Sequence, residues 1–398
     1  MNVLALSNCP VVEHEGSGYN IINTAKSFSD LGHEVSIIPP ASFLFMPFLK
    51  GRAHIYHMAF GMARWIYLNR KSLSKYKLIM LYGAESAIAL FLIKSILNIK
   101  VPIILHSNGL EVHVGFRMKH FSEYHKNRQK WYHLELAPLF KYCYRKVDAI
   151  ITVSKYDYDF AIKHLQIPSS KVYFNEPSLP ELFFDFRDGQ LPVKKKLITY
   201  CGTWIDRKGI DSIKEALPGI LRKYPNYSLR LIGVGHGFKS QDHFPEDILS
   251  QIEVHPLVTG KEQMIKMYEE STIFLFPSFC ESFGLVVAEA MFCGCAVITG
   301  PTGFAADIKN NEEAIVLDLP NGPNVYQALE KLILDKELRQ RLELSGRRRT
   351  KHLRWSNYRI RLNEILEDIF KIKRGRPKMS MSCATCTLPC KKYAGSVS

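Results

Sequence analysis

The stretch that most constrains the fold of this chain runs from residue 272 to residue 308. An apolar, β-type run ends at Pro277, and after a polar turn a helical segment follows at about 283–293. Gly294 ends that segment, and a second short apolar run occupies 296–299. This order of strand, loop, helix and strand predicts a parallel α/β unit, in which the loops at the carboxyl ends of the strands bind ligands.

The start of the predicted helix has the features of an anion-binding site. Ser282 is a candidate N-cap, so the backbone N–H groups of Phe283, Gly284 and Leu285 would point outwards at the positive end of the helix dipole. Gly284 has no Cβ and would let a ligand approach the backbone closely. The arrangement suits a phosphate group.

Two acidic residues flank this helix start. Glu281 stands just outside the predicted cap, and Glu289 lies about two turns further on, about 80° round the helix axis. Two glutamates at this spacing are, on their own, more often solvated carboxylates on an amphipathic helix. Beside an anion-binding helix start they indicate contacts with sugar hydroxyls.

The whole pattern of residues 277–294, P-S-x-x-E-S-F-G-L-V-x-x-E-A-M-x-x-G, resembles the donor-site motif of family-4 glycosyltransferases. The resemblance covers about residues 1–372 and implies the GT-B fold, an α/β fold of two Rossmann-like domains whose parallel sheets face across a cleft. It implies that Glu281 holds hydroxyls of the donor sugar, that Glu289 binds the ribose, and that the backbone of 283–285 contacts the phosphates or the sugar.

The second half of the chain also offers cations. A strand at 197–201 is followed by a loop that begins at Gly202 and contains Arg207 and Lys208. A cationic pair between a strand and a helix N-terminus would neutralise a diphosphate leaving group, and in the family an R-K-G or x-K-G motif lies on the donor diphosphate. Many relatives have a further Arg directly after the first glycine, where this chain has Thr203, so Arg207 would have to supply that charge. A solvated basic turn is the simpler alternative.

The first half of the chain supplies candidates for the acceptor side of the cleft. A loop with Gly16 and Gly18 follows the first strand, and His106 and Asn108 follow a later one. The resemblance implies that both loops face the donor phosphates and the acceptor. Relatives carry a histidine in a Ser-His-Gly-Leu-Glu loop, whereas here Asn108 takes that place and His106 lies two residues earlier. A simple helix-entry loop and a buried structural histidine are the alternatives.

Two further patterns have spacings that metal ligands also use. Asp157 and Asp159 form a D-x-D inside a predicted helix, so we expect them on the surface. Three cysteines at 383–390 have no fourth ligand nearby and lie in a segment rich in Pro, Ser, Gly and Lys, which predicts a disordered tail. We therefore expect no metal site and no cofactor other than the nucleotide-sugar substrate.

The length of 398 residues suits two domains. The predicted organisation is an N-terminal domain at 1–188, a linker at 189–196, a C-terminal domain at 197–354, a helix at 355–372 that crosses back to the first domain, and a basic tail at 373–398. Nine scattered cysteines give no disulfide framework, and no signal peptide is visible, so we expect a cytoplasmic protein.

The net charge of +15 is unevenly distributed. Residues 35–84 contain seven basic residues and no acidic one, and residues 113–148 are also strongly basic. Aromatic residues interleave with both clusters, as on a helix that lies in a lipid interface, which favours an anionic membrane surface as a partner on the inner face of the membrane. In the alternative, the aromatics belong to the core and the charges to a solvated face. No nucleic-acid motif accompanies the charge, so we expect no nucleic-acid partner.

These observations together predict a glycosyltransferase that moves a hexose from a nucleotide-diphosphate sugar to a glycan or a lipid-linked acceptor, in envelope polysaccharide or glycolipid synthesis. Retention of the anomeric configuration is implied by the family resemblance. A sugar-nucleotide epimerase or a phosphorylase of the same fold stays open, although no pyridoxal-phosphate lysine motif supports the latter. A catalytically silent binding protein also stays open, because Thr203 and Asn108 replace the usual Arg and His.

Overall fold

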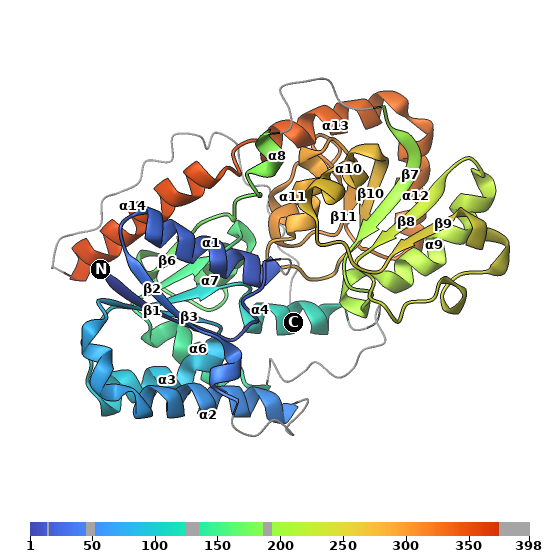
Figure 1. Ribbon diagram of the computed structural model, residues 1–398. Coiled ribbons are helices and arrows are strands. Elements are labelled where there is room, and N and C mark those ends of the chain that lie inside the picture. The colour runs from blue at the N-terminus through green and yellow to red at the C-terminus, as the bar shows by residue number, and fades with distance from the viewer. Residues whose placement is uncertain (14–15, 45–51, 122, 124–134, 186–192, 374–398) are drawn as a thin grey trace.

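The structure, a computed structural model, describes residues 1–13, 16–44, 52–121, 123, 135–185 and 193–373. It contains two six-stranded parallel sheets, and this confirms the predicted α/β fold with two Rossmann-like domains (Figure 1). The strands of the first sheet are β1 (Asn2–Ser7), β2 (Glu34–Ile38), β3 (Leu78–Tyr82), β4 (Ile103–Ser107), β5 (Ala149–Thr152) and β6 (Val172–Phe174), in the order β2-β1-β3-β4-β5-β6. Strands β3, β4 and β5 are buried along their whole length, as expected where helices cover both faces of a parallel sheet.

Helices cover both faces of the first sheet (Figure 1). One face carries α1 (Gly16–Asp30), whose Ile21 and Phe28 are fully buried against the sheet. The opposite face carries α2 (Arg52–Leu68), α3 (Ala87–Phe91) with a π-helical turn at Leu92–Ile96, α6 (Ala137–Lys146) and α7 (Lys155–Lys163). Helix α4 (Glu111–His120) begins at the carboxyl end of β4 and extends towards the second domain.

The second sheet has the order β12-β11-β10-β7-β8-β9. Its strands are β7 (Lys195–Cys201), β8 (Ser228–Ile232), β9 (Ile252–His255), β10 (Ser271–Phe276), β11 (Ala296–Thr299) and β12 (Ile315–Val316), and its helices are α9 (Ile210–Lys223), α10 (Lys261–Glu270), α11 (Leu285–Phe292), α12 (Gly322–Leu334) and α13 (Lys336–Thr350). Strand β10 lies between β7 and β11, so the loops after β7 and β10 leave the same edge of the sheet side by side.

The chain passes between the domains twice. Short helix α8 (Leu182–Asp185) already packs on the second domain, where Leu179 and Phe183 join the core, so the first crossing precedes the residues assigned to the linker. The linker residues up to 192 lie outside the described part, and β7 begins at Lys195. Helix α14 (Trp355–Lys373) returns and packs on the first sheet beside α1 (Figure 1). No helix in the described ranges is long and apolar enough to span a bilayer.

Candidate active site

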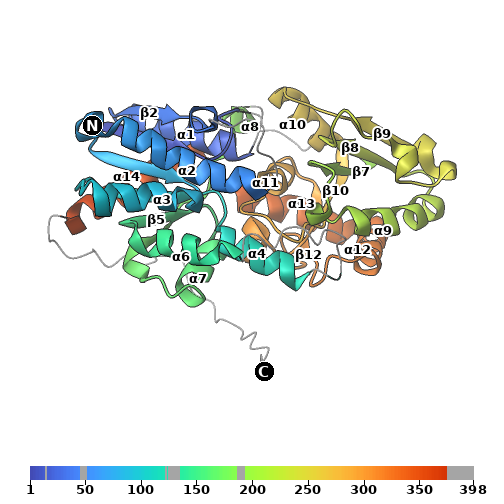
Figure 2. The same ribbon diagram turned by 90° about the horizontal axis from the view of Figure 1, so that it is seen from below.

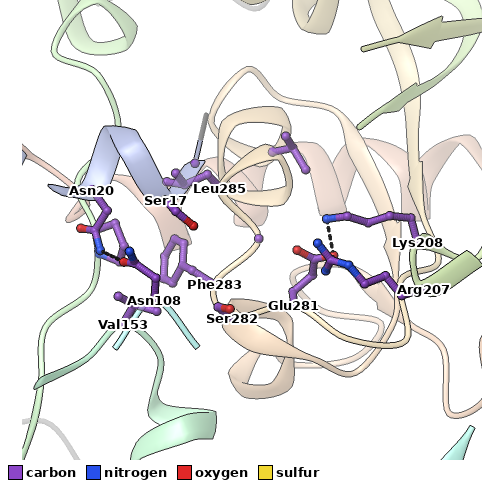
Figure 3. Close-up of a pocket in the computed structure, with 14 residues that line it drawn as sticks. Ser17, Asn20, Asn108, Val153, Arg207, Lys208, Glu281, Ser282, Phe283 and Leu285 are labelled. Carbon is purple, nitrogen blue, oxygen red and sulfur yellow. Dashed lines mark hydrogen bonds and ion pairs between the residues drawn. The ribbon is translucent and has the colours of Figure 1, made fainter. Parts of the chain in front are cut away.

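A pocket of about 270 Å³ lies where the two domains meet. The first domain contributes the start of α1 and the loop after β4, and the second contributes the loops after β7 and β10 and the start of α11 (Figure 3). Its lining residues are Gly16, Ser17, Asn20, Asn108, Val153, Pro177, Arg207, Lys208, Glu281, Ser282, Phe283, Gly284, Leu285 and Val286. The volume is slightly below the usual range for a ligand pocket, about 300–1,000 Å³, and suits part of a nucleotide-sugar molecule.

The second domain places a buried ion pair in this pocket. Lys208 Nζ lies 2.6 Å from Glu281 Oε1, and both side chains are almost completely shielded from solvent, with exposures of 13% and 11%. The same carboxylate oxygen accepts a hydrogen bond from Ser278 Oγ at 2.6 Å and lies 3.8 Å from a guanidinium nitrogen of Arg207. The structure thus brings together all three residues that we predict to be catalytic (Figure 3).

Backbone contacts hold the loops after β7 and β10 against each other. The carbonyl oxygen of Arg207 accepts the N–H of Phe279 at 2.9 Å and lies 3.0 Å from the hydroxyl oxygen of Ser278. Gly209 has φ +75°, and a Cβ built there would lie 2.1 Å from the carbonyl oxygen of Pro277. The glycine of the R-K-G motif is therefore required by close packing of two backbones as well as by its left-handed conformation.

Burial and charge act in opposite directions on the two partners of the ion pair. Burial lowers the pKa of Lys208, and the attraction of Glu281 offsets this only in part. Burial alone would raise the pKa of Glu281, but the neighbouring Lys208 and Arg207 outweigh it and hold the pKa below its usual range. The site therefore contains a desolvated cation that an additional anion would stabilise.

Helix α11 begins two residues later than predicted. Gly284 occupies the N-cap position with φ 87° and ψ 55°, and Ser282 makes no capping hydrogen bond, so the Ser282 assignment is wrong. The left-handed glycine turns the chain into the helix, and the N–H of Val287 donates to the carbonyl of Gly284 at 2.9 Å. The backbone N–H groups of Leu285 and Val286 therefore lie in the first turn of α11, beside the pocket.

Four residues expected in the donor or cleft region do not line this pocket: Glu289, Gly202, Gly18 and, as described below, His106. Glu289 is buried in the second domain, where it accepts a hydrogen bond from the Tyr268 hydroxyl at 3.2 Å and lies 3.8 Å from Lys261 Nζ. Gly202 donates its N–H to the carbonyl of Ile232 at 2.8 Å. Gly18 packs on the first loop of the chain, where a Cβ would lie 2.3 Å from the carbonyl oxygen of Val12.

The first domain lines the pocket with an amide pair. Asn20 on α1 donates from Nδ2 to Oδ1 of Asn108 at 2.6 Å, and both residues line the pocket. Oδ1 of Asn20 and Nδ2 of Asn108 are buried and have no hydrogen-bond partner among the described residues. Gly16 also lines the pocket, and a Cβ there would lie 3.8 Å from the Leu285 side chain across the domain boundary. Asn20 was missed because nothing in the sequence links α1 to the loop at Asn108.

His106 does not face the pocket. It is fully buried in β4, its ring lies 5.2 Å from that of Tyr82, and neither ring nitrogen has a hydrogen-bond partner among the described residues. Burial lowers its pKa to about 4, so the imidazole is neutral at pH 7. The expectation of a cleft histidine is therefore wrong, because alternation along β4 turns this side chain towards the layer that holds α14.

Asp157 is also placed differently from the prediction. It is buried at the start of α7, where its carboxylate accepts from Leu110 N at 3.3 Å and lies 2.7 Å from His113 Nδ1. Asp159 pairs with Lys155 and Lys163 on the surface as expected. The cysteines at 383–390 lie outside the described residues.

A buried carboxylate pair supports the loop that carries Asn108. Glu111, the first residue of α4, accepts the N–H of Ala84 at 2.8 Å and the hydroxyl of Tyr144 at 2.5 Å. Burial and the neighbouring Glu85 raise the pKa of Glu111 to about 8. Burial next to Glu85 thus favours the neutral form of this carboxyl group at the start of α4.

Two family models match adjoining parts of the chain. The model described as Glycosyltransferase Family 4 matches residues 15–174, and the model described as Glycosyl transferases group 1 matches residues 183–349. The first match contains strands β2 to β6 of the first sheet, and the second contains all six strands of the second sheet.

Curated relatives match more remotely. An uncharacterized glycosyltransferase of Methanocaldococcus jannaschii is 25% identical over 58% of this chain and 62% of its own length. The D-inositol 3-phosphate glycosyltransferase of Corynebacterium kroppenstedtii is 24% identical over 46% and 43%, and the capsular polysaccharide biosynthesis glycosyltransferase CapM of Staphylococcus aureus is 29% identical over 39% and 41%. The matches thus span less than two thirds of these relatives.

Solved structures share the whole architecture. Sucrose-phosphate synthase from Thermosynechococcus elongatus superposes with a TM-score of 0.73 at 14% identity, over 94% of this chain and 100% of its own. HepE from Anabaena, solved in complex with UDP-glucose, has a TM-score of 0.62 at 15% identity, over 92% and 99%. At such identities the likeness concerns the fold, which is GT-B. With one family model on each half of this fold, the chain belongs to the glycosyltransferases of family 4.

Proposed function

We propose that this protein transfers a hexose from a nucleoside-diphosphate sugar to a hydroxyl group of an acceptor, with retention of the anomeric configuration. The observation that carries the proposal is the buried Lys208–Glu281 pair with Arg207 beside it, at a pocket that both domains line. Glycosyl transfer from such a donor needs cations at the leaving diphosphate and a hydrogen-bond acceptor at the sugar, and this arrangement supplies both.

The cations of the pocket can stabilise the charge that develops when the bond between the donor sugar and the diphosphate breaks. As the bond between the anomeric carbon and the diphosphate oxygen lengthens, negative charge grows on the diphosphate, and Lys208 and Arg207 would stabilise it in a water-poor site. Lys208 is well suited because its own counterion only partly offsets the cost of its burial. Glu281, which is kept ionised by the same cations, would accept hydrogen bonds from the donor-sugar hydroxyls.

Other donor contacts follow from the same geometry. The N–H groups of Leu285 and Val286 would bind a phosphate or sugar oxygen at the start of α11. Glu289, with Lys261 3.8 Å away, stays our candidate for the ribose, further along the same helix. Because side-chain cations would carry the leaving-group charge, we propose that no metal is required, and we expect EDTA to leave the rate unchanged.

The amide pair on the opposite wall fits an acceptor hydroxyl. In either orientation of the two side-chain amides, the Asn20–Asn108 hydrogen bond uses one carbonyl oxygen and one amino group. The other carbonyl oxygen can accept a hydrogen bond from an acceptor hydroxyl, and the other amino group can donate one to it. We propose a glycan or lipid-linked acceptor, supported by the likeness to CapM, and UDP-glucose as the first donor to test, supported by the likeness to HepE.

The test is the release of nucleotide from a panel of UDP-, GDP- and ADP-sugars, with and without a lipid extract or short oligosaccharides. A transferase releases nucleotide in an acceptor-dependent way and forms a glycoside whose anomeric configuration NMR identifies. An epimerase converts the sugar nucleotide without net release, and a silent binding protein retains it unchanged. No release with any donor, or release unaffected by Lys208→Ala and Glu281→Ala, would refute the proposal.

A further inference from the structure

The outer helical layer of the first domain has exposed apolar and basic side chains that the packing of the core does not explain. It consists of α2, α3 with its π-helical turn, and α6, which pack side by side on one face of the sheet. Figure 2 shows the molecule from the side of this layer, which we call the helical face. Its inner side chains form the core, so its outer side chains are available for another role.

Large apolar side chains are exposed on the helical face. Tyr56, Phe60, Tyr67 and Leu68 are 46%, 56%, 51% and 58% exposed, and at about 100° per residue all four fall within about one third of the circumference of α2. On the neighbouring segment, Phe91 and Ile96 are 47% and 61% exposed. Such a grouping marks an interaction site more often than a solvated surface.

The charge of the helical face has a single sign. No acidic residue occurs in the sequences of α2, α3, the π-helical turn or α6. Arg64 is exposed within the apolar stripe of α2, and the guanidinium of Arg70, just after this helix, lies 4.4 Å from the centre of the exposed Tyr67 ring. Within these described helices the charged side chains are thus all cationic, which is the pattern of helices at an anionic lipid interface.

A basic hollow continues the stripe on α6. Its lining includes Lys141, Tyr142, Arg145 and Lys146, its volume is about 630 Å³, and the Tyr142 ring lies 6.4 Å from that of Phe91. Two more lysines reach the same end of α6.

These two lysines hold the end of α6 by hydrogen bonds to its carbonyl groups. Lys94 donates to the carbonyl of Lys146 at 2.6 Å, and Lys171 donates to that of Arg145 at 3.3 Å. The carboxylate of Asp148 lies 3.2 Å from Lys94 Nζ. The cations that line the hollow are therefore Lys141, Arg145 and Lys146, and Tyr142 and Phe91 place aromatic rings beside them.

We propose that the helical face docks on an anionic lipid bilayer, with Phe60, Tyr67 and Phe91 in the interfacial region and a lipid phosphate group in the hollow at Lys141 and Arg145. An acidic protein or a nucleic acid would also match the charge, and such a partner is the conclusion if the vesicle test below fails. A bilayer surface matches both features, since its headgroups take the cations and its acyl boundary takes the rings.

The test is sedimentation of the full chain with vesicles of phosphatidylcholine alone and with about 30% phosphatidylglycerol, at about 50 and 500 mM NaCl. We expect binding to the anionic vesicles at low salt, a large loss at high salt, and little binding to the neutral vesicles. The triple variant Lys141→Gln/Arg145→Gln/Lys146→Gln should bind on the order of 100-fold more weakly, at about fivefold for each cation. Phe60→Ser/Tyr67→Ser should also weaken binding.

Two controls separate this face from other surfaces. Leu344→Ser removes an apolar side chain that is 54% exposed on α13, and Lys266→Gln removes an exposed cation on α10; neither should change vesicle binding. All variants keep the basic tail, so unchanged binding of the helical-face variants would overturn the proposal, as would no binding at low salt. Because these variants leave the interdomain pocket intact, release of nucleotide with a soluble acceptor should not change, and the two proposals can fail independently.

Discussion

Replacing Lys208 by methionine separates the structural from the chemical role of the buried ion pair. In Lys208→Met, Glu281 keeps the Ser278 hydroxyl at 2.6 Å and Arg207 at 3.8 Å but loses the partner at 2.6 Å. Removing one member of a buried pair costs about 3–5 kcal/mol. Because Arg207 remains, we expect about 3 kcal/mol of lost stability, measured by urea unfolding followed by circular dichroism.

The double variant Lys208→Met/Glu281→Gln removes both charges and should regain stability to within about 1 kcal/mol of the parent protein. Its activity should not return. Loss of the cation at the diphosphate should lower kcat about 100- to 1,000-fold in both variants, as expected for a group that stabilises charge in the transition state. If the double variant regained kcat/KM along with stability, the pair would only support the fold, and the reasoning would be wrong.

Three other predictions concern the surroundings of the pair. Asn108→Ala should raise KM for the acceptor about tenfold with little change in kcat, because one hydrogen bond to a bound hydroxyl is lost; an unchanged acceptor KM would remove this residue from the acceptor site. Gly209→Ala should abolish most activity and lower the melting temperature, since its Cβ would overlap the Pro277 carbonyl, whereas Gly237→Ala has open space around it and should be silent in both assays. Burial and Glu85 raise the pKa of Glu111 to about 8, so the free energy of unfolding should fall as the pH rises from the ordinary carboxyl range to about 8. Unfolding curves measured at a series of pH values should show a smaller dependence of this free energy on pH in Glu111→Gln. The same pH dependence in both proteins would contradict the prediction.

The donor half of the site could be predicted from the sequence because its residues are local to two loops. Arg207 and Lys208 follow one strand, Glu281 follows the next strand along the sheet, and neighbouring parallel strands end at the same edge. The start of α11 was predicted less well. Propensity favours a serine cap, but the chain enters the helix through the left-handed Gly284, a conformation that sequence composition does not reveal.

The acceptor half could not be predicted in the same way because it depends on the direction of single side chains. The sequence of β4 is apolar on both faces, so nothing in it tells whether His106 points to the cleft or to the core. The burial of Asp157 could not be predicted because its partner His113 belongs to another helix, 44 positions away in the chain. Asn20 gains its place in the pocket through a contact with Asn108, which lies 88 positions away in the chain.

The central claim is that a nucleoside diphosphate binds at the buried cation of the interdomain pocket. Isothermal titration with UDP, GDP and ADP tests it most directly, with the parent protein and the stable Lys208→Met/Glu281→Gln variant side by side. We predict that at least one nucleoside diphosphate binds the parent protein and that the double variant binds it at least about tenfold more weakly, since a charge-assisted contact contributes about 1.5–3 kcal/mol. Equal affinity for both proteins, or no binding of any of the three to the parent protein, would contradict the account.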